Sequence, residues 1–276
     1  MSPSRRPLDQ VGDATRAAAA ARWLRRSASA AAREAVATAV SLCGIPLVLG
    51  GAAVAPGGGH RSPPVGVHGH ADTPVILVHG FAASPACWSV LRRALHADGR
   101  MVVSFAYAPW ASSVEELAAR LTDTMENLLE ATGAGHVHLV GHSLGGVVIA
   151  QALTDDRLSG GVHTVVTLGA PFGGCPWAWL FPMRPLIWAL RPGSPLLRRL
   201  AAWPPPPGVR WLAFGSALDP VVPADHAVPA NRQATCVMVE TAGHAGMLLD
   251  RAVVERIVAE TAVPAPDVDP VELLGA

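Results

Sequence analysis

The sequence predicts an α/β fold, a mostly parallel sheet with helices on both faces. From Thr73 onward, short apolar runs alternate with helical patterns, which is the order of elements in sheets of this kind. A Gly-x-Ser-x-Gly pentapeptide, residues 141–145, follows the apolar run 137–140 directly. Glycines on either side of a serine in this setting indicate a tight turn that leads from a strand into a helix.

Each element of this fold has its own signal. The clearest helix is expected over residues 114–130, where Ser113 and Glu116 form a capping box, apolar side chains make one stripe, and Gly133 can end the helix. Further helices are expected after the pentapeptide, over 146–153, and near the end, over 251–260. The six expected strands are the runs 75–78, 101–105, 137–140, 162–168, 209–214 and 236–239.

Composition favours one large folded domain. Half of the 276 residues are apolar, 15% are charged, and the formal net charge is zero. Such a chain is not a disordered protein, and its charge argues against a nucleic-acid partner. We expect a linker at 56–72, the α/β domain at 73–262 and a flexible tail at 263–276, because proline and glycine gather in the first and proline and aspartate in the last.

The N-terminal region has the charge pattern of a membrane-inserted segment. Seven arginines crowd residues 1–34, and no charged residue follows between 35 and 55. Those 21 residues would make a helix of about 30 Å, which matches a bilayer core, with the arginines on the cytoplasmic side. The prediction is an anchor with the domain outside the cytoplasm. A cleaved signal segment and secretion are less favoured because Pro56 follows the Ala-Val-Ala site, and an Ala-rich helix packed on a soluble body is the remaining alternative.

An insertion over residues 173–207 interrupts the alternation. It holds four tryptophans and nine prolines, and the stretch from Arg157 to Leu218 has six arginines and no acidic residue. An apolar and basic surface suits an anionic membrane or a lipid-like substrate. Trp177 and Trp179 are therefore candidate substrate-binding residues in a cap. The alternative is that the tryptophans only pack the cap onto the domain.

Ser143, at the centre of the pentapeptide, is the candidate nucleophile. A serine hydroxyl needs a base within hydrogen-bond reach and an acid that orients this base. Asp219 lies just beyond an expected strand and His244 lies in a glycine-flanked loop after the last one, which is the chain order Ser, Asp, His of strand-turn-helix hydrolases. Asp225 is the alternative acid. His142 is expected to line the site or pack there, since neighbouring side chains in the turn diverge.

Backbone N–H groups are also needed where negative charge develops on a reacting carbonyl. The N–H groups of Phe81, after the first strand, and Leu144, after the serine, are the candidates. His79 is interpreted as structural. No cofactor or metal is expected, because His60, His68 and His70 fall in the linker and the four cysteines lack a C-x-x-C pair. A disulfide cannot be assigned from the spacing.

Five motifs occur in an order that resembles the α/β-hydrolase superfamily, in particular small secreted bacterial lipases and esterases. They are residues 75–81, 138–146, 165–174, the loop around Asp219, and 243–246. The resemblance covers roughly residues 73–261. It implies cleavage of an acyl ester or lipid-like substrate through an acyl-enzyme, with Ser143, Asp219 and His244 as the triad and Phe81 and Leu144 as the oxyanion donors. The tryptophan-rich insertion is a departure, because the smallest such lipases lack a lid.

Two other functions stay open at this point. The same fold can transfer an acyl group to an alcohol or an amine, or carry another chemistry of the superfamily. A membrane-anchored binding protein without catalysis is the third reading, and the intact order of Ser143, Asp219 and His244 argues against it. No obligate protein partner is implied.

Overall fold

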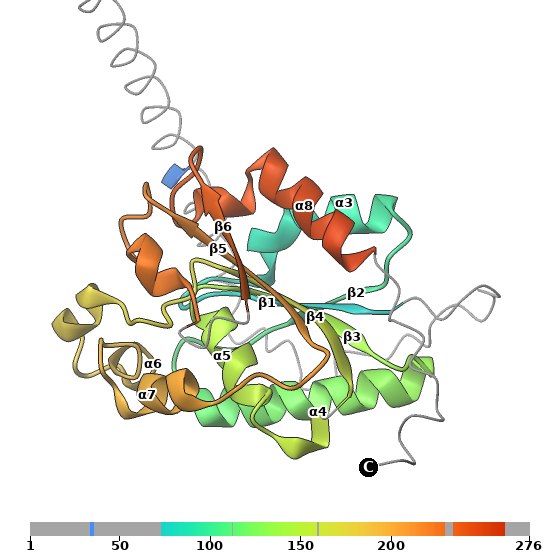
Figure 1. The fold of residues 1–276 in the computed structure, drawn as a ribbon, viewed down its shortest axis with the longest axis horizontal. Coiled ribbons are helices and arrows are strands. Elements are labelled where there is room, and N and C mark those ends of the chain that lie inside the picture. The colour runs from blue at the N-terminus through green and yellow to red at the C-terminus, as the bar shows by residue number, and fades with distance from the viewer. Residues whose placement is uncertain (1–33, 36–72, 112, 159, 230–233, 263–276) are drawn as a thin grey trace, which may run out of the picture.

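The predicted parallel sheet is present. The computed structural model describes residues 34–35, 73–111, 113–158, 160–229 and 234–262. Six strands lie in the order β2-β1-β3-β4-β5-β6, and each neighbouring pair is parallel (Figure 1). Their bounds are β1 Val75–Val78, β2 Val102–Phe105, β3 Val137–His142, β4 Val162–Leu168, β5 Arg210–Ser216 and β6 Ala234–Val239.

The strands form because their side chains can be buried on both faces of the sheet. Every residue of β1, β3 and β4 is buried, as expected for central parallel strands. β6 lies at an edge and is buried only at Val239. β3 is two residues longer than predicted, because Gly141 and His142 continue the pairing with β4 up to the turn at Ser143.

Helices cover the two faces in pairs. α4 and α5 pack on one face, and α3 and α8 on the other (Figure 1). Two apolar cores result, one on each side of the sheet, so every central strand is shielded from water. The helix bounds are α3 Ser89–Ala97, α4 Val114–Thr132, α5 Leu144–Ala152 and α8 Arg251–Thr261.

The predicted capping residues of α4 are confirmed. The hydroxyl oxygen of Ser113 accepts a hydrogen bond from the N–H of Glu116 at 3.0 Å, and Gly133 adopts the left-handed conformation at φ 70°. These groups satisfy part of the backbone that a helix leaves unpaired at its termini. The helix nevertheless runs to Thr132, two residues beyond the predicted end.

The segment between β4 and β5 contains only short helical pieces. They lie beyond the carboxyl end of the sheet, at the left of Figure 1, and each begins with a proline, which suits the first position of a helix. Their bounds are η3 Pro176–Leu180, α6 Pro185–Trp188 and α7 Pro195–Ala202.

Several predictions fall outside the described residues. They are the segment 35–55 beyond Ala35, the linker 56–72 with its three histidines, Cys43, and the tail 263–276. Within the described part of the chain, no helix has the length and apolar character needed to cross a bilayer. The domain bounds and the anchor stay predictions.

Candidate active site

Ser143 lies at a sharp turn between β3 and α5. Its φ of 54° and ψ of −123° are unusual for a residue with a side chain. Among the described residues, Ala82 at φ 53° is the only other non-glycine residue with positive φ. A Cβ atom at Gly145 would collide with the carbonyl oxygen of Val78, and one at Gly141 would lie 2.7 Å from the nitrogen of Gly146. The packing therefore requires glycine on both sides of the serine.

His244 and Asp219 are paired behind this turn. Nδ1 of His244 lies 2.7 Å from Oδ2 of Asp219. The other carboxylate oxygen accepts hydrogen bonds from the N–H groups of Val221 and Val222, at 2.8 Å each. The buried carboxylate is thus fixed in orientation, and an N–H at Nδ1 leaves Nε2 of His244 as the basic nitrogen of the ring. Asp219, rather than Asp225, occupies the position next to His244.

His142 connects the serine turn to the loop that carries His244. Its Nε2 lies 3.0 Å from the carbonyl oxygen of His244 and donates to it, and the two ring centroids are 4.7 Å apart. Burial lowers the pKa of His142 to about 3, against the opposing effect of this hydrogen bond, so the ring is neutral at physiological pH. His142 is buried and does not belong to the pocket wall that Ser143 lines.

His79 supports the loop that follows β1. Its Nδ1 donates to the carbonyl oxygen of Gly80 at 2.9 Å, and its ring stacks on Tyr107 at 4.2 Å between centroids. The Tyr107 hydroxyl donates to the carbonyl oxygen of His79 at 2.7 Å. Burial lowers the pKa of His79 to about 4. The neutral ring holds the loop, as the sequence predicted.

Ser143 opens onto an apolar pocket of about 170 Å³. Phe81 and Trp177 contribute to its wall, together with Pro171, Phe181, Ile187 and Leu190. The indole N–H of Trp177 donates to the carbonyl oxygen of Pro220 at 2.9 Å, which connects the segment after β4 to the loop of Asp219. A nucleophile candidate on an apolar wall suits an apolar ligand.

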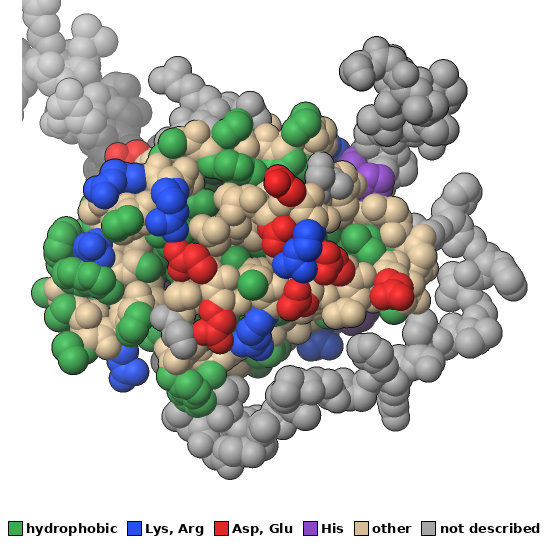
Figure 2. Space-filling model, turned by 90° about the horizontal axis from the view of Figure 1, so that it is seen from below, with side chains coloured by type: hydrophobic (Ala, Val, Ile, Leu, Met, Phe, Trp, Pro, Cys, Tyr) green, Lys and Arg blue, Asp and Glu red, His purple; other side chains and the backbone are tan. Residues whose placement is uncertain are grey.

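Trp179 does not belong to this wall. It packs edge-on against Trp188, with ring centroids 5.3 Å apart, and the guanidinium of Arg191 lies over both rings. Trp177 and Trp179 are both about half exposed. Together with Leu180, Phe181 and Met183 they are exposed apolar side chains of one short segment, and Figure 2 shows apolar side chains gathered at its left edge.

The two predicted oxyanion donors both lie near Ser143. Leu144 is the first residue of α5, and Phe81 lines the same pocket as Ser143. The left-handed Ala82 follows Phe81 directly. Strained backbone of this kind gathers at functional sites. The structure places both backbones beside the serine, and their role as donors stays a prediction.

Residues 75–212 match the alpha/beta hydrolase family, and this match covers half of the chain. The protein belongs to the alpha/beta hydrolase family. A curated relative, the putative carbamate hydrolase RutD of Variovorax paradoxus, is 33% identical over 96 residues. This match covers 33% of the present hydrolase and 36% of RutD, so it spans about a third of each chain.

Solved structures of two lipases and a phospholipase share the fold. The mature lipase BlEst2 of Bacillus licheniformis superposes with a TM-score of 0.62 at 16% identity, over 73% of this hydrolase and 97% of that chain. Lipase B of Aspergillus fumigatus gives 0.60 at 17% identity, over 74% and 56% of the two chains. Phospholipase PlaB of Legionella pneumophila gives 0.59 at 13% identity, over 71% and 59%. At these identities the likeness shows a common fold.

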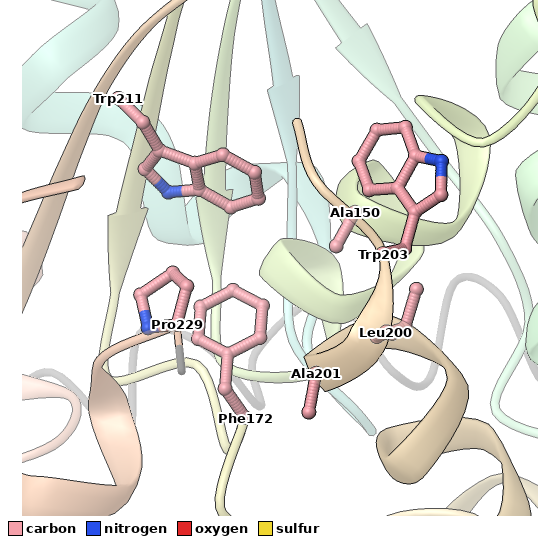
Figure 3. A pocket seen from close by; sticks show the side chains of 7 residues that line it. All are labelled: Ala150, Phe172, Leu200, Ala201, Trp203, Trp211 and Pro229. Atoms are coloured by element: carbon pink, nitrogen blue, oxygen red, sulfur yellow. The ribbon is translucent and has the colours of Figure 1, made fainter. Parts of the chain in front are cut away.

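A second, smaller pocket lies between α5, α7 and β5 of the hydrolase. Its volume is about 20 Å³, room for little more than one water molecule. Figure 3 shows the rings of Phe172 and Trp211 side by side in it, packed edge to face with centroids 5.7 Å apart. The wall has no charged side chain. It consists of Ala150, Phe172, Leu200, Ala201, Trp203, Trp211 and Pro229.

Sequence reasoning missed two residues that shape the site. Gly169 has a φ of 54°, and a Cβ there would lie 3.0 Å from Nδ1 of His244 and 3.1 Å from Oδ2 of Asp219. The hydroxyl of Ser216 donates to the carbonyl oxygen of Ala242 at 2.6 Å, two residues before His244. A glycine at the end of a strand next to the serine strand was the available signal for Gly169. Nothing in the sequence pointed to Ser216.

The described residues contain no cluster of histidine, cysteine or acidic side chains with the geometry of a metal site. Cys87, Cys175 and Cys236 are each free rather than in disulfides. Burial raises the pKa of the Cys87 thiol to about 12, so this thiol is not a competing nucleophile.

Proposed function

We propose that this hydrolase cleaves carboxylic esters with Ser143 as its nucleophile. The observation that carries the proposal is the 2.7 Å pairing of His244 with Asp219 behind a serine held in a left-handed turn. A histidine oriented by a buried carboxylate and joined to the serine turn is the arrangement that activates a hydroxyl.

In this mechanism Nε2 of His244 takes the proton of Ser143 as the hydroxyl oxygen attacks the ester carbonyl. Asp219 stabilises the imidazolium that forms and keeps the ring in one tautomer. The N–H groups of Phe81 and Leu144 hold the oxyanion. His244 then returns its proton to the leaving alcohol, and water hydrolyses the acyl-enzyme through the same steps in reverse.

The pocket supports an ester with a short apolar acyl chain. Its volume of about 170 Å³ lies below the range of roughly 300–1,000 Å³ that is usual for drug-sized ligands, and apart from Ser143 and Cys175 its wall is made of apolar residues. The exposed surface of Trp177, Trp179, Leu180, Phe181 and Met183 supports a lipid-like or aggregated substrate, since amphipathic aromatic residues favour such interfaces.

A fluorophosphonate probe tests the nucleophile. We expect it to label the wild-type protein and the control Ser89→Ala, whose exposed serine lies at the start of α3, and to leave Ser143→Ala unlabelled. Labelling of Ser143→Ala, or no labelling of the wild type, would contradict the proposal.

The substrate class is tested with a panel of p-nitrophenyl esters. We expect butyrate to be cleaved faster than palmitate, because the pocket is small. A p-nitrophenyl carbamate belongs in the panel, since a partial relative bears the name of a carbamate hydrolase. Faster turnover of the carbamate would favour that second function, and capture of the acyl group by added alcohol would favour acyl transfer.

A further inference from the structure

Glu34 contacts the loop of His244 from the far N-terminal side of the chain. Its Oε1 accepts a hydrogen bond from the N–H of Ala245 at 2.8 Å, across 211 residues of sequence. Its Oε2 accepts one from the N–H of Gly246 at 2.7 Å. Glu34 and Ala35 are the short blue segment near β6 in Figure 1. One carboxylate therefore binds two consecutive amides directly after the candidate base.

The hydrolase domain itself holds the other groups of this loop. Asp219 holds the His244 ring, His142 holds the His244 carbonyl, and Ser216 holds the carbonyl of Ala242. The amides on the following side of His244 are held by Glu34. Hydrogen bonds to a charged carboxylate are roughly twice as strong as those between neutral groups, so the loop depends on Glu34 for a substantial part of its order.

The space for the carboxylate is shaped by a glycine. A Cβ atom at Gly243 would lie 2.8 Å from Oε2 of Glu34 and equally close to the carbonyl oxygen of Leu218. Any larger residue there would push the carboxylate away from the amides. The glycine that the sequence places before His244 thus makes room for a side chain from outside the α/β domain.

We propose that Glu34 is a positioning residue for His244, which it serves by fixing the backbone that follows the histidine. This role rests on the proposed function of His244 as the base. Glu34 is not part of the pocket wall next to Ser143, so it acts on the rate of proton transfer and not on substrate binding. A displaced catalytic group can lower turnover about 100-fold for a shift of about 1 Å.

The contact also constrains the N-terminal segment. Glu34 directly precedes the predicted span 35–55, and the α/β domain follows that span. A single crossing would put Glu34 and His244 on opposite sides of the membrane, whereas the two hydrogen bonds require them on the same side. The proposal therefore puts Glu34 on the same side of any membrane as the α/β domain.

The contact is tested in the full chain with Glu34→Gln and Glu34→Ala. Hydrogen exchange at the amides of Ala245 and Gly246 is measured by NMR, with Glu130→Gln, an exposed residue of α4, as the control. We expect both amides to exchange at least about tenfold faster in Glu34→Ala and less so in Glu34→Gln, which keeps one acceptor oxygen. Unchanged exchange in Glu34→Ala would overturn the proposal, and this readout does not depend on catalysis.

Kinetics then test the positioning role. For p-nitrophenyl butyrate we expect kcat to fall roughly tenfold to 100-fold in Glu34→Ala, less in Glu34→Gln, with KM unchanged. If amide exchange becomes faster and kcat stays unchanged, the contact of Glu34 with the loop is real, but its role in positioning His244 is overturned. Absence of any esterase activity in the wild type would instead reject the proposed function. Should Glu34→Ala not fold, Glu34→Gln alone decides between these outcomes.

The side of the membrane is tested by labelling. In a Cys43→Ser background, Ala35→Cys adds a thiol next to Glu34, and the native exposed Cys236 reports on the domain. An impermeant maleimide should reach both thiols from the same side of sealed vesicles, or both in soluble protein. Labelling from opposite sides would overturn the proposal.

Discussion

β3 carries a buried histidine near each end, and the two have different surroundings. Burial lowers the pKa of both His138 and His142 to about 3. At the carboxyl end, His142 is hydrogen-bonded to the backbone of His244. At the amino end, neither ring nitrogen of His138 has a hydrogen-bond partner within the described residues, and its ring packs edge-on against His163 at 5.4 Å. Burial keeps both rings neutral, but only the hydrogen bond of His142 connects a ring to the candidate active site.

The candidate catalytic groups likewise gather at one end of the sheet, the carboxyl end of its strands. The two left-handed non-glycine residues of the described chain, Ala82 and Ser143, lie just past the carboxyl ends of β1 and β3, as does the His244–Asp219 pair past β5 and β6. In open α/β sheets, ligands bind at this edge. Four variants test this difference between the two ends of the sheet.

The largest effect is expected for Asp219→Asn. The amide cannot hold the His244 ring in the required tautomer, so kcat should fall about 10⁴-fold while the fold is kept. Asp225→Asn is the matched control and should retain most activity. The measurement is kcat on p-nitrophenyl butyrate, with circular dichroism for the fold. Near-normal activity of Asp219→Asn together with loss in Asp225→Asn would transfer the role of the acid to Asp225.

Gly169→Ala should have the second largest effect. Its new Cβ would press on both His244 and Asp219, at 3.0 and 3.1 Å, so we expect a loss of roughly 100-fold in kcat. Gly99→Ala is the control, because Gly99 also has positive φ, at 75°, but has no atom within 4 Å of an added Cβ. That control should lose about 1 kcal/mol of stability and keep its kcat. Equal kinetic losses in both variants would assign the effect to backbone strain.

A smaller loss is expected for His142→Leu. Removal of the hydrogen bond to the carbonyl of His244 should lower kcat roughly tenfold. His138→Leu, at the other end of the same strand, should leave kcat unchanged. If both variants lose activity to the same extent, the difference between the two ends of β3 has no consequence for turnover.

At neutral pH the smallest effect is expected for His138→Leu, which should change how the stability depends on pH. The folded-state pKa of His138 is about 3, below its ordinary value of 6.5, because of burial and the nearby charges of His163, Arg100, Arg210 and His136. The unfolded chain therefore binds a proton below pH 6.5 that the folded chain does not. Stability is fully present above that pH and falls by up to about 1.4 kcal/mol per pH unit as the pH drops toward 3.

His138→Leu should lose less stability than the wild type between about pH 6 and pH 4. At pH 7 it should be at least as stable, since two buried nitrogens without partners are removed. Urea unfolding midpoints at pH 7, 6 and 4 measure both effects. Parallel losses of stability in the two proteins would mean that His138 is protonated in the folded state.

Local sequence signals predicted much of the fold. The six strands follow from short runs of apolar residues, and the caps of α4 follow from a capping box and a glycine. Each of these signals lies within or next to the element that it predicts. The pairing of Asp219 with His244 was also predictable, because Asp219 is the first acidic residue after the serine turn to follow a strand end.

Contacts between distant segments could not be predicted in this way. Glu34 meets Ala245 across 211 residues, and nothing in the periodicity of either segment indicates it. Trp177 and Trp179 are two residues apart in the short helix η3, and only the folded backbone decides that the first lines the pocket. His142 was expected to line the site or to pack there, and at the end of a fully buried strand it is hydrogen-bonded to the loop of His244.

The left-handed backbone at Ser143 sets a trade-off between durability and catalysis. A side chain in this conformation costs on the order of 1–3 kcal/mol, and glycine at the same position would relieve it. Selection of variants for heat resistance alone should therefore enrich Ser143→Gly, which lacks the hydroxyl of the candidate nucleophile. A search for a hardier form of this protein has to screen for turnover and survival together.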